Sequence, residues 1–184
     1  MDADIKNNVE FKDLGELPEP QQKTNQDINN IMLTGIGGTG VLTISAILAY
    51  AAHYEGKDSS VLDMTGLAQK GGAVWSHIKI FEKNNKPYSQ KISPGSANVL
   101  LACDGVVGTK PEIQEVVSQE KTITVLNNNT IPVADFITQR DIDFKNNDVF
   151  HMLENTTKKI ISNIPAISIS EKLSGDALGT NMLM

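Results

Sequence analysis

The chain has 184 residues, of which 40% are hydrophobic and 21% are charged, a balance that is ordinary for one well-buried soluble domain. Its formal net charge is −6 and it has no local run of Lys and Arg, which argues against a nucleic-acid partner, because binding phosphates requires clustered basic side chains. No stretch is apolar for the roughly 18 or more residues that a membrane span needs. The start is polar and acidic, unlike a signal peptide, so we expect a cytoplasmic protein with no membrane partner.

Few residues are available for metal or disulfide chemistry. Cys103 is the single cysteine, so the chain has no partner thiol for an internal disulfide and too few thiolates for a zinc site or an iron–sulfur cluster. The histidines, His53, His77 and His151, lie far apart and show no metal-ligand spacing. We therefore expect no metal site on this chain.

The first 30 residues are polar and short of large apolar side chains, which is typical of a linker or of an arm laid over a neighbour. We expect the folded domain to span 31–184. The long polar lead and the abrupt stop of the apolar segment Asp176–Met184 suggest a piece of a longer polypeptide.

The first predicted strand is the short apolar run Asn30–Thr34, and a glycine run follows it at once. A helix is predicted over Val41–His53, because its apolar residues recur at helical spacing and Gly56 is a stop signal. Two further strands are predicted at Ser59–Asp63 and Val74–Phe81, with a turn at Asn84-Asn85.

The second half of the chain also alternates between predicted strands and predicted helices. Apolar strands separated by helices imply a sheet that is covered on both faces. We therefore expect an α/β fold, namely a Rossmann-like, doubly wound, mostly parallel sheet with helices on both faces. The predicted segments are a strand at Asn98–Cys103, a helix from Pro111 with Ile113, Val116 and Val117 on its apolar side, a strand at Thr122–Leu126, a loop at Gln139–Asp148, a helix at Phe150–Ile161, a strand at Ala166–Ile169 and a helix over Asp176–Met184.

The glycine run Gly35-Ile36-Gly37-Gly38-Thr39-Gly40 is the strongest local signal. Gly35, Gly37 and Gly40 fit the pattern G-x-G-x-x-G between a predicted strand and a predicted helix, where the free N–H groups of a helix N-terminus attract anions. Asp63 ends the next predicted strand, 23 residues beyond Gly40, near the usual place of a ribose-binding acid. A bound cofactor and a purely structural glycine turn both remain open, whereas a P-loop is excluded because no Gly-Lys-Ser/Thr follows.

A second glycine-bearing segment runs from Asp63 to Gly72, after a predicted strand and so at the carboxyl edge of the sheet, where open α/β sheets bind ligands. Lys70, beside Gly71 and Gly72, is suited to hold a phosphate or a carboxylate. A surface loop with a solvated lysine is the alternative.

Other side chains carry weaker signals. Cys103 lies in an apolar run and is expected to be an inert core thiol. His53 and His77 are expected to be packed or solvated, and Trp75 is either a core residue or an interface anchor. Asp104, at a strand end, either binds a ligand or caps the next segment. No paired carboxylates and no nucleophile–His–acid arrangement are visible, so we assign no catalytic residue.

Several stretches closely resemble the γ domain of indolepyruvate:ferredoxin oxidoreductases, which pyruvate and ketoisovalerate ferredoxin oxidoreductases share more loosely. The block Asp63–Gly72 is specific to the resemblance, whereas the glycine run alone is not. The similar stretches are Thr34–Val41, Ala51–Lys57, Ser60–Gly72, Leu101–Asp104, Val125–Asn127 and Gly175–Asn181, with Leu17–Pro20 resembling a linker in fused, long-chain members.

The resemblance implies a thiamine-diphosphate enzyme that oxidatively decarboxylates an aryl 2-oxoacid, passes electrons through [4Fe–4S] clusters to ferredoxin, and yields an acyl-CoA. The motifs for thiamine diphosphate with Mg²⁺ and for the clusters are absent from this sequence, which implies that other domains or subunits carry them and are the partners of this chain. The glycine run and Lys70 are then candidates to bind coenzyme A (CoA). The residues expected at a cofactor are Gly35, Gly37, Gly38, Thr39, Gly40, Asp63, Lys70, Gly71 and Gly72.

Two other functions fit the residues. One is an NAD(P)- or FAD-dependent dehydrogenase domain that uses Gly35, Gly37, Gly40 and Asp63. The other is a non-catalytic assembly module in which the glycine turn is purely structural. The first interpretation, a γ domain, depends on the expectation that both glycine-bearing segments meet at the carboxyl rim of the sheet and help to wall a reaction centre whose cofactors other polypeptide supplies.

Overall fold

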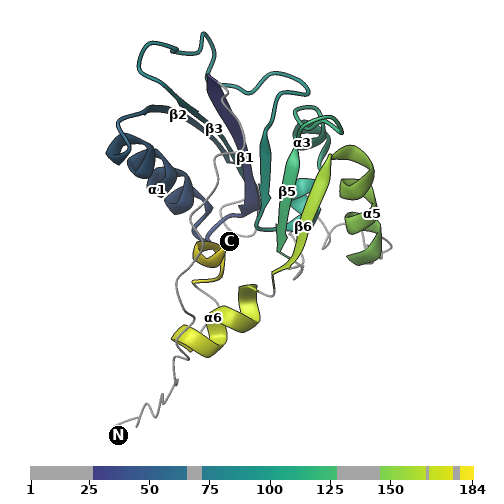
Figure 1. The fold of residues 1–184 in the computed structure, drawn as a ribbon. Coiled ribbons are helices and arrows are strands. Elements are labelled where there is room, and N and C mark those ends of the chain that lie inside the picture. Colours follow the sequence, from purple (N-terminus) through teal and green to yellow (C-terminus); the bar gives the residue numbers. More distant parts are fainter. Residues whose placement is uncertain (1–26, 66–71, 128–145, 165, 176–178) are drawn as a thin grey trace, which may run out of the picture.

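The computed structural model describes residues 27–65, 72–127, 146–164, 166–175 and 179–184. They form a single six-stranded sheet with the strand order β2-β3-β1-β4-β5-β6 (Figure 1). The strands are β1 (Ile28–Ile36), β2 (Asp58–Thr65), β3 (Ala73–Phe81), β4 (Val99–Ala102), β5 (Ile123–Asn127) and β6 (Lys159–Ile164).

Helices connect and cover these strands. The helices are α1 (Val41–Tyr54), α2 (Gly105–Gly108), α3 (Pro111–Gln114), α5 (Asn146–Thr156) and α6 (Ala166–Ser174), and a 3₁₀ turn, η1, spans Thr180–Leu183.

The sheet is mixed but mostly parallel. The pairs β1–β4, β4–β5 and β5–β6 are parallel, whereas β3 is antiparallel to both of its neighbours, β1 and β2. Only β3 therefore runs against the other five strands. The predicted fold class is confirmed, but the strand order places β3 between β1 and β2.

Helices pack on both faces of the sheet, as expected. On one face, Val41 and Ile44 of α1 pack with Leu33 and Ile78 of the sheet. The opposite face packs against residues of α5 and of the α3 region. The core on that side comprises Met32, Ile92, Ala97, Leu100, Ala102, Ile113, Val116, Val117, Leu126, Val149 and Leu153.

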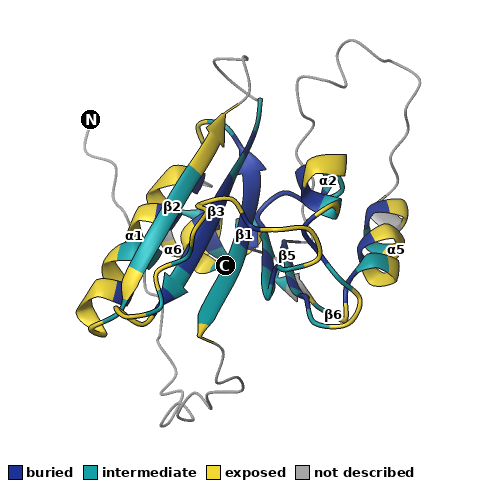
Figure 2. Ribbon diagram, turned by 90° about the horizontal axis from the view of Figure 1, so that it is seen from above, coloured by how far each residue is buried: buried dark blue, intermediate teal, exposed yellow. Residues whose placement is uncertain are grey.

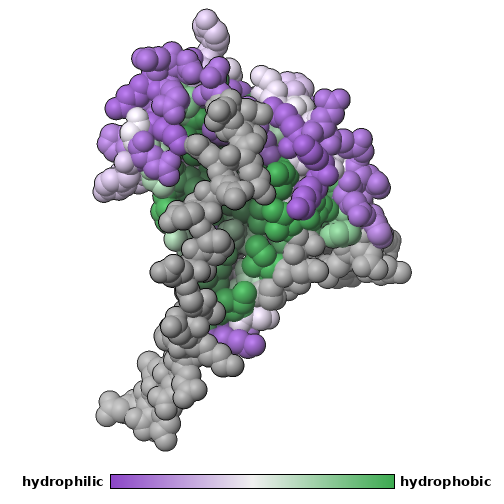
Figure 3. All heavy atoms as spheres, viewed as in Figure 1, coloured by the Kyte–Doolittle hydropathy of each residue, from purple (hydrophilic) through white to green (hydrophobic). Residues whose placement is uncertain are grey.

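Each face is only half covered by the described helices. On the α1 face, α1 contacts β1, β2 and β3, and Ile161 of β6 remains 46% exposed. In the space-filling view, apolar residues gather over the β4–β6 side, next to hydrophilic residues at the top (Figure 3). On the other face, the edge strand β2 is intermediate or exposed along its whole length, and no described helix lies over it in Figure 2.

The predicted strands up to β5 and the helix over Val41–His53 are confirmed with small changes at their ends, whereas the helix expected from Pro111 ends at Gln114, before Val116 and Val117. The turn at Asn84-Asn85 is present, with Asn85 N–H donating to the Glu82 carbonyl at 2.8 Å. Gly56 ends α1 with a positive φ of 77°. β1 begins at Ile28, three residues before the predicted start of the domain, and residues 1–26 lie outside the described part of the chain.

Two predicted elements near the C-terminal end are wrong. The helix expected over Phe150–Ile161 begins at Asn146, inside the loop expected at Gln139–Asp148, and ends at Thr156, after which the chain forms strand β6. The strand expected over Ala166–Ile169 is the first turn of helix α6. The alternating Ile and Ser residues there have the periodicity of a strand, but the edge beside β5 is already taken by β6. Of the helix predicted from Asp176, only the short turn η1 falls among the described residues.

Candidate functional site

The glycine turn joins β1 to α1 and needs glycine at two of its positions. Gly38 and Gly40 have φ values of 89° and 83°, a left-handed conformation that other residues adopt at a cost. Both are exposed, whereas Thr39 between them is half-buried and donates its hydroxyl to the Ile36 carbonyl at 2.7 Å. The turn therefore presents its backbone to solvent in a fixed shape.

Gly35 serves packing and not ligand approach. A Cβ atom built on Gly35 would lie 2.5 Å from Cγ2 of Val41 and 3.4 Å from Cβ of Cys103. Its lack of a side chain lets the first turn of α1 sit directly on β1. Close packing of the helix on the strand therefore depends on the first glycine of the motif. In the dinucleotide-binding fingerprint, the third glycine has that role.

The N-terminus of α1 is uncapped by any side chain. The N–H groups of Thr43 and Ile44 both donate to the Gly40 carbonyl, at 3.0 and 3.2 Å. Among the described residues, the N–H groups of Gly40, Val41 and Leu42 find no acceptor. These unpaired N–H donors, together with the positive end of the helix dipole, favour the binding of an anion at this point.

The two glycine-bearing segments meet. Gly37 N–H donates to the Gly72 carbonyl at 2.8 Å, so the turn after β1 lies against the chain that enters β3. Lys70 and Gly71 lie outside the described residues. The expectation that both segments share one rim of the sheet is confirmed at Gly37 and Gly72.

Asp63 has local partners. Its Oδ1 accepts hydrogen bonds from Ser76 of β3 at 2.5 Å and from Ser45 of α1 at 3.3 Å. Because β3 lies between β1 and β2, Asp63 is also two strands away from the glycine turn, about 10 Å by normal strand spacing. This geometry favours a role in tying α1 to the sheet, and it removes the main support for a dinucleotide-binding fingerprint.

A pocket opens where α/β sheets usually bind ligands. After β1 the chain crosses to α1 on one face, and after β4 it continues into α2 on the other face, so β1 and β4 flank a topological switch point. The pocket lies just beyond the carboxyl ends of β1, β4 and β5, next to the glycine turn. Its lining residues are Ile36, Thr39, Cys103, Asp104, Asn127, Ile167, Thr180 and Asn181.

Polar side chains organise the walls of this pocket. Asn181 of η1 donates from Nδ2 to the carbonyl oxygen and to Oγ1 of Thr39, at 2.7 and 2.8 Å. Asn127 donates from Nδ2 to the Cys103 carbonyl at 3.2 Å, and Asp104 Oδ1 accepts from the N–H of Val107 at 2.9 Å, so Asp104 caps α2. Asn127 and Asn181 were not among the expected site residues, although both lie in stretches that resemble the γ domain.

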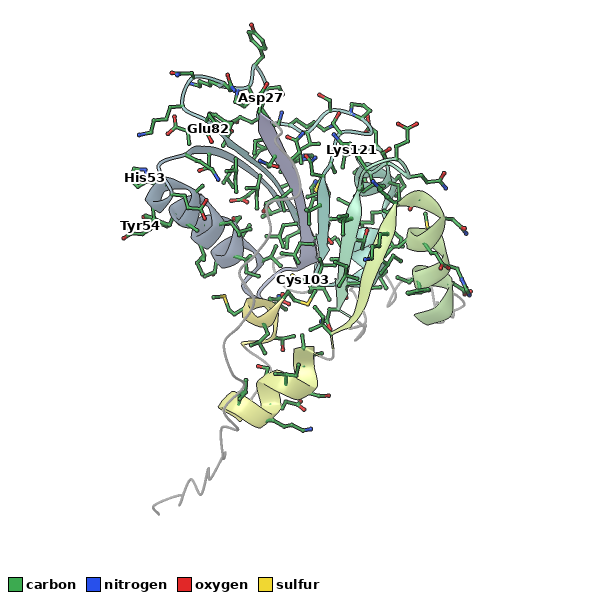
Figure 4. All side chains as sticks on the ribbon, viewed as in Figure 1. Asp27, His53, Tyr54, Glu82, Cys103 and Lys121 are labelled. Atoms are coloured by element: carbon green, nitrogen blue, oxygen red, sulfur yellow. The ribbon has the colours of Figure 1, made fainter. Side chains whose placement is uncertain are left out.

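Cys103 lines the pocket but is not a reactive thiol. It is 5% exposed, and burial, reinforced by the negative charge of Asp104, raises its pKa to about 12. Figure 4 shows it at the end of the sheet where η1 lies. The thiol is therefore protonated at neutral pH, which confirms the expectation of an inert core cysteine.

The two remaining histidine candidates and Trp75 lie outside the pocket. His53 is exposed on α1. His77 is 2% exposed on β3, and Trp75 is half-buried against the core formed with Met32. No group of three His, Cys, Asp or Glu side chains in the described ranges could hold a metal ion. The same part of the chain contains no helix of the length and apolarity required to span a bilayer.

Known proteins resemble this chain in both sequence and fold. Residues 30–184 match the sequence model of the family described as "Pyruvate ferredoxin/flavodoxin oxidoreductase". Indolepyruvate oxidoreductase subunit IorB of Archaeoglobus fulgidus is 28% identical over 156 residues, which cover 84% of this chain and 73% of that protein. The IorB subunit of Thermococcus kodakarensis is 32% identical over 77 residues, covering 42% of this chain and 37% of that protein.

Two solved structures share the fold. Pyruvate oxidoreductase subunit PORC of Thermotoga maritima superposes with a TM-score of 0.55 at 18% identity, covering 84% of this chain and 71% of that chain. The 2-oxoglutarate:ferredoxin oxidoreductase of Magnetococcus marinus, solved with 2-oxoglutarate, coenzyme A and succinyl-CoA bound, gives a TM-score of 0.59 at 18% identity. That match covers 86% of this chain but 23% of the larger one. At this identity the two structures establish the fold alone.

Proposed function

Because this chain belongs to the pyruvate ferredoxin/flavodoxin oxidoreductase family, we propose that it forms the γ-type domain of a cytoplasmic 2-oxoacid:ferredoxin oxidoreductase. The proposed reaction is oxidative decarboxylation of an aryl 2-oxoacid to its acyl-CoA, with electrons passed to ferredoxin. The names of the IorB relatives support indolepyruvate as the substrate. The resemblance of the block Asp63–Gly72 points to the same branch of the family.

The residues of this chain do not fit an iron–sulfur cluster. A [4Fe–4S] cluster is held by several thiolates, whereas Cys103 is the single cysteine and its pKa is raised to about 12 by burial. We therefore assign the clusters, and with them thiamine diphosphate and its Mg²⁺, to other subunits or domains. This chain then contributes one wall of the assembled site.

CoA is the ligand that we propose for this chain's own surface. The single observation that carries the proposal is the 2.8 Å hydrogen bond from Gly37 to Gly72, because it holds the turn that precedes α1 against a residue that follows Lys70 by two positions in the sequence. The free N–H groups of Gly40, Val41 and Leu42 are suited to hold phosphate oxygens, and the Lys70 ammonium would add a charge. Bound CoA supplies the thiol that accepts the acyl group. Asp63, which is engaged with Ser45 and Ser76, is left out of this site.

Calorimetric titration of CoA into the assembled oxidoreductase tests the site. Lys70→Ala is expected to weaken CoA binding by about tenfold or more, because a charge-assisted phosphate contact is lost. The matched control, Lys86→Ala, changes an exposed lysine in the loop between β3 and β4 and should leave the affinity unchanged. Equal CoA affinity for the wild type and Lys70→Ala would remove Lys70 from the site.

Two further measurements separate the proposed function from its alternatives. The ratio kcat/KM is expected to be higher for indolepyruvate than for pyruvate with reduced ferredoxin as the readout, and the reverse order would reject the aryl substrate. A fluorescence titration of the 184-residue chain with NADH should show no stoichiometric binding. Tight binding would instead favour a dehydrogenase.

A further inference from the structure

A second group of polar side chains lies far from the glycine turn, on the sheet face opposite α1. Lys79 and His77 both belong to β3 and, being two residues apart, point to the same face. Lys79 lies six residues along β3 from Ala73, or about 20 Å at normal strand rise. Figure 4 shows Glu82, which follows β3, and Cys103 at opposite ends of the sheet.

Lys79 has a covered side-chain stem and no counter-ion among the described residues. Its exposed fraction is 6%, and no ion pair or hydrogen bond engages its ammonium anywhere in the described chain. Even Asn30, directly opposite Lys79 on β1, keeps its buried Oδ1 without a hydrogen bond. Burial lowers the pKa of Lys79, as expected for an ammonium that is partly removed from water.

His77 provides a second hydrogen-bond donor beside Lys79. Its Nδ1 accepts a hydrogen bond from the N–H of Ile92 at 3.2 Å, so in the neutral ring the proton sits on Nε2. No acceptor for that Nε2–H is present among the described residues. Burial, followed by the charges of Lys91 and Lys79, lowers the pKa of His77, so Lys91 also contributes positive potential here.

The surroundings of this pair have the composition of a protein interface. Met64 of β2, directly opposite the half-buried Trp75 of β3, is 41% exposed, and Leu62 lies opposite His77. Aromatic and Met side chains around a partly covered charge are typical of the energetic centre of a contact. No described helix covers this part of the sheet (Figure 2), although the loop between β3 and β4 reaches His77 at Ile92.

We propose that Lys79 and His77 receive a carboxylate side chain of a partner subunit, which docks on the β2–β3 half of the sheet face opposite α1. The charge complementarity is specific, since a carboxylate accepts from both the ammonium and the imidazole N–H. The adjacent apolar side chains favour a protein over a free anion, because a small ion would leave Met64 exposed. The inference rests on the proposed function only in requiring partner subunits, and it is independent of CoA.

The decisive variant is Lys79→Met, which keeps an unbranched apolar stem and removes the charge. The substitution should not destabilise the free chain, but it should weaken the binding of the chain to its partner subunits. In the free 184-residue chain the melting temperature should stay the same or rise, because an unpaired and partly desolvated charge is removed. In the presence of the partner subunits, the dissociation constant measured by interferometry should rise at least about tenfold, because the partner's carboxylate then loses its cation.

Two control variants complete the design. Lys86→Met removes an exposed charge from the neighbouring loop and should leave assembly unchanged. Lys79→Arg keeps a cation and should restore most of the binding. The proposal is overturned if Lys79→Met assembles as well as the wild type, or if it melts at a markedly lower temperature as a free chain, since Lys79 would then be a structural residue. Failure of the wild type itself to bind any partner subunit would instead reject the proposed function.

Cross-linking identifies the source of the carboxylate. A zero-length carbodiimide should couple Lys79 to an Asp or Glu of a partner subunit in the assembled enzyme, and mass spectrometry of the digest would locate both ends. Inorganic phosphate provides the opposing test. If millimolar phosphate raises the melting temperature of the free chain, and Lys79→Met abolishes that rise, the site binds a free anion and the docking proposal is wrong.

Discussion

Asn181 holds the glycine turn from a position 142 residues further along the chain. Its Nδ2 donates to the carbonyl oxygen of Thr39 at 2.7 Å and to Thr39 Oγ1 at 2.8 Å, while that hydroxyl donates in turn to the Ile36 carbonyl. Both partners are removed from bulk solvent, since Asn181 is 7% exposed and Thr39 is half-buried. The shape of the turn that we propose for CoA therefore depends on η1 as well as on its own glycines.

Asn181→Ala should weaken both the fold and CoA binding. The loss of two hydrogen bonds to a half-buried partner is expected to lower the free energy of unfolding by about 1–3 kcal/mol in urea denaturation. CoA affinity of the assembled enzyme should fall, whereas the KM for the 2-oxoacid should not change. The control is Asn84→Ala, in the exposed turn after β3.

A double-mutant cycle with Thr39→Val isolates the side-chain contact. Because Asn181 and Thr39 Oγ1 share one hydrogen bond, the two substitutions should be non-additive by about 0.5–1.5 kcal/mol. Additive effects would mean that Asn181 acts through the Thr39 carbonyl alone.

Gly35→Ala should destabilise the domain by steric overlap. The new Cβ would lie 2.5 Å from Cγ2 of Val41, a buried β-branched side chain that has little room to move, so we expect a loss of about 1–3 kcal/mol on unfolding. Gly37→Ala is the matched control, because its nearest neighbour, the Gly72 carbonyl oxygen, would be 3.4 Å away and its φ is not positive. The second substitution Val41→Ala should recover part of the loss at Gly35, and no recovery would point to a different cause.

Acid should destabilise the fold through His77. Because the pKa of His77 is lowered in the folded state, first by burial, the unfolded chain binds the proton more readily. Its contribution to stability is then complete above the ordinary His value of about 6.5, and it is lost as the pH falls through the lower folded value. Protonation would also place an N–H on Nδ1 against the N–H of Ile92.

Urea unfolding between pH 7.5 and 5 measures this effect. His77→Gln should flatten the loss of stability below pH 6.5, since a glutamine oxygen can accept from Ile92 without titrating. His53→Gln, at an exposed position on α1, should leave the profile as it is. Parallel profiles for the wild type and His77→Gln would show that another group controls the acid response.

Cys103 should resist alkylation in the folded protein and need not take part in the chemistry. With a pKa of about 12, only about one thiol in 10⁴ is ionised at pH 8, so iodoacetamide should react about 10³-fold more slowly than in urea. Cys103→Ala in the assembled enzyme should retain most of kcat. Rapid labelling of the native protein, or a loss of several orders of magnitude in kcat, would make this thiol a catalytic residue.

Local patterns in the sequence determined much of the fold. The apolar runs and the periodicity of 41–53 located β1, α1 and the strands up to β5, because these segments carry a clear period and end at Gly, Pro or Asn. The same reasoning failed over 150–169. There, short stretches such as Lys159–Ile164 and Ala166–Ser174 fit either helix or strand, and the free edge of β5 decides between them.

The features of the candidate site can be divided in the same way, into those that the local sequence determines and those that the tertiary structure determines. Glycines 38 and 40 and the uncapped start of α1 follow from the sequence, since positive φ and a strand–glycine–helix order are local properties. Three features needed the tertiary structure: the insertion of antiparallel β3, which separates Asp63 from the glycine turn; the hydrogen bonds of Asn181 to Thr39; and the covering of the Lys79 side chain with no counter-ion among the described residues. Each of these depends on which distant segments become neighbours, and that is set by the packing of the whole sheet and not by the residues on either side.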